Sequence, residues 1–154
     1  MGSFGDGGAF SFFPSKNLGA MGDGGLFVTN CDNAAHQALK LRNHGGINKY
    51  RNDTLGYNSR LDSIQAAILS IKLKHVDRWN NGRRDVAARY NTLMSDFDKV
   101  VTPDVVEGHV FHQYTIRVVD ADRDAVHQSM VDAGIGCMVY YPTPQDLLPV
   151  YGHS

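Results

Sequence analysis

The sequence has few cysteines, no long apolar run and no excess of charge of either sign. Cys31 and Cys137 are the two cysteines among 154 residues, and they form no CxxC or zinc-type cluster. This pattern fits a reducing compartment better than a disulfide framework. A formal net charge of −1 gives no reason to expect nucleic acid or an anionic membrane as a partner. No segment approaches the ~18 apolar residues of a membrane span, and the first residues do not have the pattern of a signal peptide. We therefore expect a cytoplasmic globular protein.

Several motifs with known chemistry are also missing. The sequence contains no phosphate-binding GxxxxGK[ST] loop, no GxSxG nucleophile turn and no dinucleotide-binding GxGxxG after a strand. His109 and His112 have a spacing that a metal site could use, but on an alternating strand they would point to opposite faces. Arginines around residues 78–89 alternate with Asp77 and Asp85, which is typical of a solvated helix face. We expect neither a metal site nor a nucleic-acid interface.

One lysine lies between an apolar strand and glycine-rich turns, and it is the strongest chemical signal in the sequence. Residues 9–13 and 26–28 are apolar and predict two short strands. Pro14 ends the first strand shortly before Lys16, which places the lysine on the loop between them. Four glycines follow the lysine and allow the backbone to approach a ligand closely: Gly19, Gly22, Gly24 and Gly25. The alternative is that Lys16 is an ordinary solvated loop lysine.

The middle of the chain has the periodicity of helices. Apolar residues predict a helix that includes residues 35–41 and ends before Gly45, followed by a polar loop over residues 45–60. A second helix is predicted from Leu61, and a third from Val76. The third carries a stripe of apolar side chains that we expect to be core: Trp79, Val86, Tyr90, Leu93 and Phe97.

The last third predicts a small α/β layer. Residues 109–119 partly alternate between apolar and polar, which indicates a strand. Asp122 is a candidate cap for a helix over residues 124–133, and residues 137–141 predict a further strand. Together these segments form a β-α-β unit.

A loop lysine suits chemistry with a carbonyl cofactor. Its amine condenses with an aldehyde to a Schiff base, and it becomes a nucleophile when burial or a nearby cation lowers its pKa. Backbone N–H groups in the adjacent glycine-rich turns can hold a phosphate. Lys16 is therefore the best candidate for a reactive group.

Several segments, in order along the chain, carry a resemblance to one enzyme family. Residues 11–19 read Ser-Phe-Phe-x-x-Lys-Asn-Leu-Gly and are followed by Gly-Asp-Gly-Gly at 22–25. Residues 41–45 read Leu-Arg-Asn-His-Gly, and residues 56–62 read Gly-Tyr-Asn-Ser-Arg-Leu-Asp. The sequence closely resembles the DegT/DnrJ/EryC1/StrS family of pyridoxal-phosphate-dependent sugar aminotransferases. Matching segments also occur at residues 2–6, 63–69, 72–93 and 134–142.

The resemblance implies a cofactor and roles for three residues. Lys16 would form the Schiff base with pyridoxal 5'-phosphate and move the proton during transamination. Ser11 would hydrogen-bond the cofactor phosphate, and Asn58 would reach the phosphate of the neighbouring subunit's cofactor. The family acts as a dimer that transfers an amino group, commonly from glutamate, to a nucleotide-linked ketosugar. Relatives with histidine in place of the lysine are dehydratases, so Lys16 favours the transaminase branch.

The same resemblance implies an incomplete α/β fold of the aspartate-aminotransferase type. Residues 1–75 would be the remnant of the large cofactor-binding domain, 76–99 a connecting helix, and 100–154 the small C-terminal domain. The N-terminal half of the large domain, with the carboxylate that pairs with the pyridinium nitrogen, would be missing, because Asp6 lies too near Lys16 for that role. Tyr140 and Asp146 replace histidines that the family usually has. We expect weak or no activity from the chain by itself; the alternative is a non-catalytic oligomerisation or interaction module.

Overall fold

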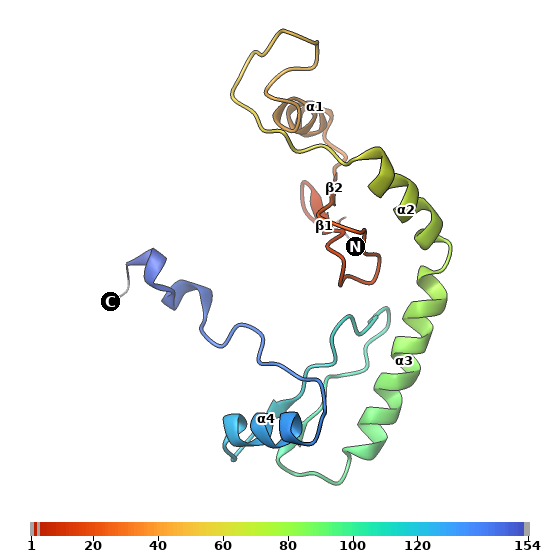
Figure 1. The fold of residues 1–154 in the computed structure, drawn as a ribbon, viewed down its shortest axis with the longest axis vertical. Helices are drawn as coiled ribbons and strands as arrows, with labels where there is room; N and C mark the ends of the chain where they lie inside the picture. Colours follow the sequence, from red (N-terminus) through yellow and green to blue (C-terminus); the bar gives the residue numbers. More distant parts are fainter. Residues whose placement is uncertain (1, 3, 153–154) are drawn as a thin grey trace. The chain divides into compact units, whose positions relative to one another are not determined.

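A computed structural model of the chain describes residue 2 and residues 4–152 (Figure 1). Ser3, within the matching segment at residues 2–6, lies outside the described residues. The chain divides into two compact units. The first comprises Met1–Ala87 and Gly108–Gln113, and the second comprises Ala88–Glu107 and Tyr114–Ser154. Both helices and strands are present, so the predicted α/β class is confirmed.

A two-stranded hairpin carries the lysine loop in the first unit. Strand β1 (Gly8–Ser11) pairs antiparallel with β2 (Gly25–Val28), with Gly8 opposite Val28 and Ser11 opposite Gly25. The backbone N–H of Phe12 donates to the carbonyl of Gly24 at 2.8 Å, which continues the pairing one step into the loop. The predicted arrangement of strand, lysine loop and strand is confirmed.

Three helices follow, as the apolar periodicity predicted. They are α1 (Asp32–Leu41), α2 (Ser63–Leu73) and α3 (Val76–Leu93). Helix α1 ends in a turn in which the N–H of Gly45 donates to the carbonyl of Lys40 at 2.9 Å, and Gly45 has a φ of 86°. This is the left-handed backbone that favours glycine at a helix end.

The second unit has less strand than the sequence predicts. Strand β3 (Val100–Val101) pairs antiparallel with β4 (Arg117–Val118), and helix α4 (Arg123–Asp132) follows. Two 3-10 turns, η1 (Gln145–Leu147) and η2 (Pro149–Tyr151), come next.

Two strand predictions in this region are corrected. The strand predicted at residues 109–119 is limited to β4, because Phe111 has a φ of 44°, which is outside the extended region. Residues 137–141 form no strand, and none of the strands in the described part of the chain pairs with them. The predicted β-α-β unit is therefore replaced by the antiparallel pair β3–β4 followed by α4.

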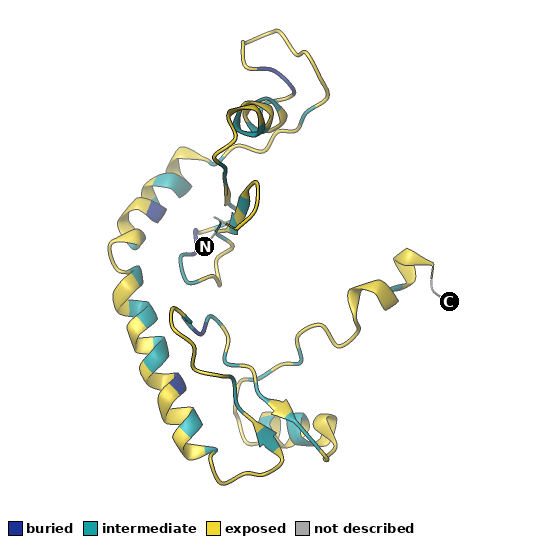
Figure 2. Cartoon of the chain, turned by 180° about the vertical axis from the view of Figure 1, so that it is seen from behind, coloured by how far each residue is buried: buried dark blue, intermediate teal, exposed yellow. Residues whose placement is uncertain are grey.

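Few side chains are buried, and Figure 2 shows that most of the chain is exposed. Among the described residues the buried apolar side chains are Ala20, Leu69, Ala87 and Phe111. Four members of the stripe on α3 and just beyond it are exposed, and Leu93 has 61% of its surface accessible. The prediction that this stripe is core is wrong for the chain by itself, because four of its five side chains are exposed. Trp79 is half-buried.

Among the described residues we find neither a candidate membrane-spanning helix nor a candidate metal site. None of their helices is both long enough and apolar enough to cross a membrane. In residue 2 and residues 4–152, no three or more His, Cys, Asp or Glu side chains form a group that could hold a metal ion.

Helix α4 begins with the side-chain cap that the sequence predicts. The Asp122 carboxylate accepts hydrogen bonds from the backbone N–H groups of Asp124 at 2.9 Å and Ala125 at 3.1 Å. Asp122→Ala should lower the free energy of unfolding by about 1 kcal/mol, because both donors lose their partner. Asp122→Asn is the matched control and should stay within a few tenths of a kcal/mol of the original protein. Urea unfolding would measure both, and equal losses would show that the cap is not the cause.

Candidate functional site

The lysine loop folds back on itself between β1 and β2. The backbone N–H of Lys16 donates to the carbonyl of Phe13, and that of Ala20 donates to Phe12, each at 2.8 Å. A Cβ atom at Gly19 would lie 2.3 Å from the carbonyl oxygen of Pro14, so the loop closes only with glycine there. The side chain of Lys16 is exposed and makes no hydrogen bond or ion pair within the described residues. Its amine is available to a ligand.

Two helices fix this loop. From α2, the Gln65 side-chain oxygen accepts from the N–H of Met21 at 2.8 Å, and the Lys72 ammonium donates to the carbonyl of Gly19. From α3, the Asn80 side-chain oxygen accepts from the Asn17 amide at 2.7 Å. The loop that presents the lysine is therefore anchored to the helices at Asn17, Gly19 and Met21.

Ser11 lies on the same hairpin as Lys16, at the end of β1. Its hydroxyl oxygen accepts a hydrogen bond from the N–H of Phe13 at 3.2 Å. The hydroxyl hydrogen is then available as a donor, and the side chain is exposed. A phosphate oxygen accepts hydrogen bonds, so the Ser11 hydroxyl has the hydrogen that such a partner needs.

Asn58 is fixed at a different place, next to the turn that ends α1. It forms an isolated antiparallel bridge with Asn43. On either side of it, the N–H of Tyr57 donates to Leu41 at 2.7 Å and the N–H of Ser59 donates to Arg42 at 2.9 Å. The Asn58 side chain is exposed, and in the described part of the chain no hydrogen bond joins it to Ser11 or Lys16. The structure thus places Ser11 and Lys16 on one hairpin and Asn58 on a different segment, paired with the end of α1.

The loop that leads to Asn58 has an ion-pair cluster of its own. Asp53 contacts the Lys40 ammonium at 3.2 Å and the Arg51 guanidinium at 3.3 Å. The hydrogen bond from Lys40 and its charge, with help from Arg51, hold the pKa of the Asp53 carboxyl below its ordinary value. The N–H of Asp53 also donates to the carbonyl of Gly45 at 3.0 Å. These contacts close the loop over residues 45–57 onto the end of α1.

His112 lies beside the lysine loop, a place that the sequence did not predict for it. Its Nδ1 lies 2.9 Å from the side-chain oxygen of Asn17, the residue that follows Lys16. Partial burial and the positive charges of Lys16 and Arg83 lower the pKa of the imidazole below 6.5. The sequence held no usable signal, because Asn17 and His112 are 95 residues apart and an alternating strand was predicted around the histidine.

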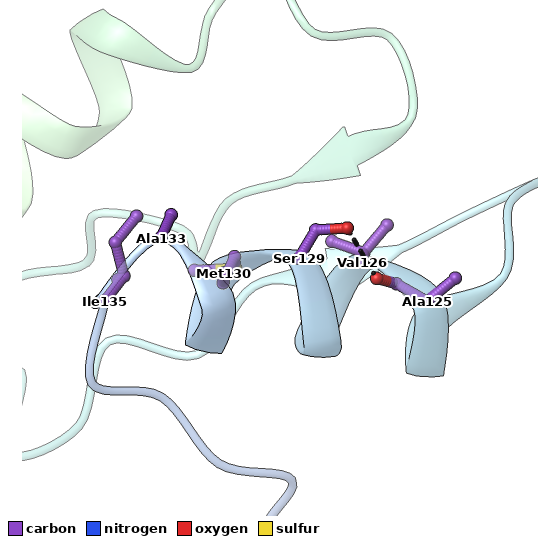
Figure 3. A pocket seen from close by; sticks show the side chains of 6 residues that line it. All are labelled: Ala125, Val126, Ser129, Met130, Ala133 and Ile135. Carbon is purple, nitrogen blue, oxygen red and sulfur yellow. Dashed lines mark hydrogen bonds between the residues drawn. The ribbon is translucent and has the colours of Figure 1, made fainter.

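An apolar hollow on α4 is a weaker candidate (Figure 3). It is lined by Ala125, Val126, Ser129, Met130, Ala133 and Ile135. Its one hydroxyl, on Ser129, donates to the carbonyl of Ala125 at 2.9 Å. No ionisable side chain lines the hollow, so it offers no acid or base that could activate this hydroxyl.

The sequence profile of the DegT/DnrJ/EryC1/StrS aminotransferase family matches residues 1–154. The chain belongs to this family. Its Lys16 loop and Asn58 segment are thus parts of an aminotransferase-family chain, and the resemblance noted from the sequence is confirmed.

Curated relatives agree with the family match. A "pleiotropic regulatory protein" of Geobacillus stearothermophilus is 50% identical over 155 residues, and the alignment covers 98% of this chain and 41% of that protein. UDP-N-acetyl-3-dehydro-alpha-D-glucosamine 3-aminotransferase of Acidithiobacillus ferrooxidans is 45% identical, with 100% of this chain and 42% of the enzyme covered. The chain therefore spans about two fifths of the length of these family members.

A solved structure extends the match to the fold. DesV of Streptomyces venezuelae, crystallised in complex with a ketimine intermediate, superposes with a TM-score of 0.89 at 39% identity. The match covers 98% of this chain and 41% of DesV. The chain thus has the fold of part of an aminotransferase of this family, which confirms the fold that the resemblance implied.

Proposed function

We propose that this chain supplies the lysine segment of a pyridoxal-phosphate-dependent aminotransferase that acts on a nucleotide-linked ketosugar. The observation that carries the proposal is the exposed Lys16 amine, without a hydrogen bond or ion pair in the described residues, on a loop held by α2 and α3 of a family member. A lysine in this setting is free to condense with a carbonyl. Because the chain spans only about two fifths of its relatives, we expect weak or no transfer by the chain alone.

The residues present fit pyridoxal 5'-phosphate. When bound, this cofactor supplies the carbonyl and the electron sink of the reaction. Lys16 would bond to it and hold or move a proton at Nζ. The Ser11 hydroxyl would donate to the phosphate, since its oxygen already accepts from Phe13. Asn58 would donate from its exposed amide to the phosphate bound by a second subunit.

The remaining parts of the proposal follow the family and the named relatives. The Acidithiobacillus relative is a UDP-sugar aminotransferase, which supports a nucleotide-linked ketosugar as substrate. An amino donor such as glutamate is what the family resemblance implies. We assign residues 1–75 to the cofactor-binding domain, 76–99 to a connecting helix and 100–154 to the small domain. Cys31 and Cys137 carry free thiols, which suits the proposed cytoplasmic location.

Covalent trapping tests the proposal directly. The protein is mixed with pyridoxal 5'-phosphate, reduced with borohydride and digested, and mass spectrometry locates the pyridoxyl group among the six lysines of the chain. We expect Lys16 to carry most of the label at low cofactor concentration. Equal labelling of Lys16, Lys74 and Lys99, all of them exposed, would overturn the role of Lys16.

Exposed apolar side chains favour a second function as an oligomerisation module. On α2, Ile64 has 73% and Ile71 has 63% of its surface accessible. Exposed apolar surface of this kind marks contact sites between proteins. Light scattering after size-exclusion chromatography should show a dimer or a larger oligomer. A monomer at all concentrations would overturn this second function and leave the labelling of Lys16 as a separate question.

A further inference from the structure

Three side chains form a hydrogen-bonded relay next to the reactive lysine. The Asn17 amide nitrogen donates to the Asn80 oxygen at 2.7 Å, and the Asn17 oxygen lies 2.9 Å from Nδ1 of His112. All three residues are half-buried, and they come from the lysine loop, from α3 and from the segment Gly108–Gln113 of the same unit. We call these three residues the relay.

The relay determines which ring nitrogen of His112 carries the proton. Asn17 uses its amide nitrogen toward Asn80, so it presents only its oxygen to His112. An oxygen acceptor requires a donor, and Nδ1 must therefore carry the hydrogen. The lone pair of the neutral ring then lies on Nε2, for which no partner is found among residue 2 and residues 4–152.

Partial burial and nearby positive charge keep this ring neutral. The ring is partly desolvated, and the charged groups that act on it are Lys16 on the loop and Arg83 on α3, both positive. All three influences disfavour the imidazolium and lower the pKa of His112. Because interactions between charges are reciprocal, a proton on His112 and the charge on Lys16 repel each other.

The segment that carries His112 is also held independently of the relay. The Arg84 guanidinium donates to the carbonyl of His109 at 3.0 Å. Phe111 is buried, and its N–H donates to Nδ1 of His109 at 3.0 Å. The ring of His112 therefore approaches Asn17 from a backbone that is already anchored.

We propose that His112 is a positioning residue for Lys16: the relay fixes the residue that follows the lysine and keeps a neutral imidazole within electrostatic range of the lysine amine. The relay itself does not depend on the proposed function; only its consequence for cofactor chemistry rests on that function. His112 acts through Asn17 and through its charge, not by contact with substrate.

Nitrogen-15 NMR of histidine side chains tests the relay in the cofactor-free chain. We expect His112 to be the Nδ1–H tautomer and to titrate below pH 6.5. Asn80→Asp should preserve this tautomer, because a carboxylate still accepts from Asn17. Asn17→Asp should shift the titration upward, because a carboxylate stabilises the imidazolium. An Nε2–H tautomer in the original protein would overturn the relay.

Reciprocal titration tests the coupling to Lys16. Lys16→Gln removes one of the charges that oppose protonation, so His112 should titrate at higher pH. Lys74→Gln is the matched control, since Lys74 is an exposed lysine whose charge is not among those that act on His112, and it should cause no shift. Equal shifts, or no shift in either variant, would contradict the coupling.

Competitive acetylation tests whether His112 affects the reactivity of the lysine. As the pH falls through the titration of His112, the rate of Lys16 relative to Lys74 should change by roughly two- to fivefold, because the imidazolium adds a positive charge near the Lys16 amine. His112→Gln keeps a donor for Asn17, and in this variant the ratio of the two rates should no longer vary with pH. If His112 had only a structural role, the variant would show the same pH profile as the original protein. If these results hold but cofactor labelling at Lys16 fails, the proposed function is wrong and the relay stands.

Discussion

Lys16→Arg is expected to reduce borohydride-trapped pyridoxyl label at position 16 to background. Arginine keeps the positive charge and most of the length of lysine, so the loop contacts made through Asn17, Gly19 and Met21 should persist. The guanidinium stays protonated at any accessible pH and cannot act as an amine nucleophile. The loss would therefore report the chemistry of the side chain and not the fold of the loop. Peptide mass spectrometry measures the label at each lysine.

Lys74→Arg is the matched control for this experiment. Lys74 follows α2, is exposed, and like Lys16 makes no side-chain hydrogen bond or ion pair within the described residues. Its replacement should leave the label at Lys16 unchanged. If label at other lysines rises to compensate in Lys16→Arg, the cofactor binds near the loop without selecting this amine, and the assignment of Lys16 fails.

Local patterns in the sequence predicted most elements of the fold. The helices α1, α2 and α3 were predicted because their apolar residues recur with the helical period, and α4 because Asp122 is a strong cap. The hairpin around Lys16 was predicted because proline and glycines interrupt two apolar runs. All of these signals lie within about one turn or one strand of the element they specify.

The features that were missed depend on contacts between distant residues. An alternating pattern predicted a strand through Phe111, but its left-handed backbone and buried ring orient His112 toward Asn17 instead. Residues 137–141 have the composition of a strand, yet a strand also needs a neighbour to pair with. The stripe on α3 was wrongly predicted to be buried for the same reason. Periodicity shows which face of a helix is apolar, but it does not show which other segment covers that face.

Gly45 controls the position of Asn58. Its φ of 86° lets the chain turn after α1, and its N–H donates to Lys40. Its backbone then lies directly against the returning segment, and a Cβ atom there would be 1.7 Å from the carbonyl oxygen of Thr54. Backbone atoms cannot move aside as the end of a flexible side chain can. The turn, and the bridge between Asn43 and Asn58 that it supports, therefore require glycine at this position.

Gly45→Ala should lower the free energy of unfolding by about 2 kcal/mol or more, because alanine adds both left-handed strain and the clash with Thr54. Gly82→Ala is the matched control: Gly82 is exposed in α3 with no atom within 4 Å of an added Cβ, and alanine there should stabilise the helix by about 0.5–1 kcal/mol. Urea unfolding measures both changes. Hydrogen exchange of the Tyr57 amide, which donates to Leu41, should accelerate in Gly45→Ala only. An unchanged exchange rate would show that the segment carrying Asn58 is held without this turn.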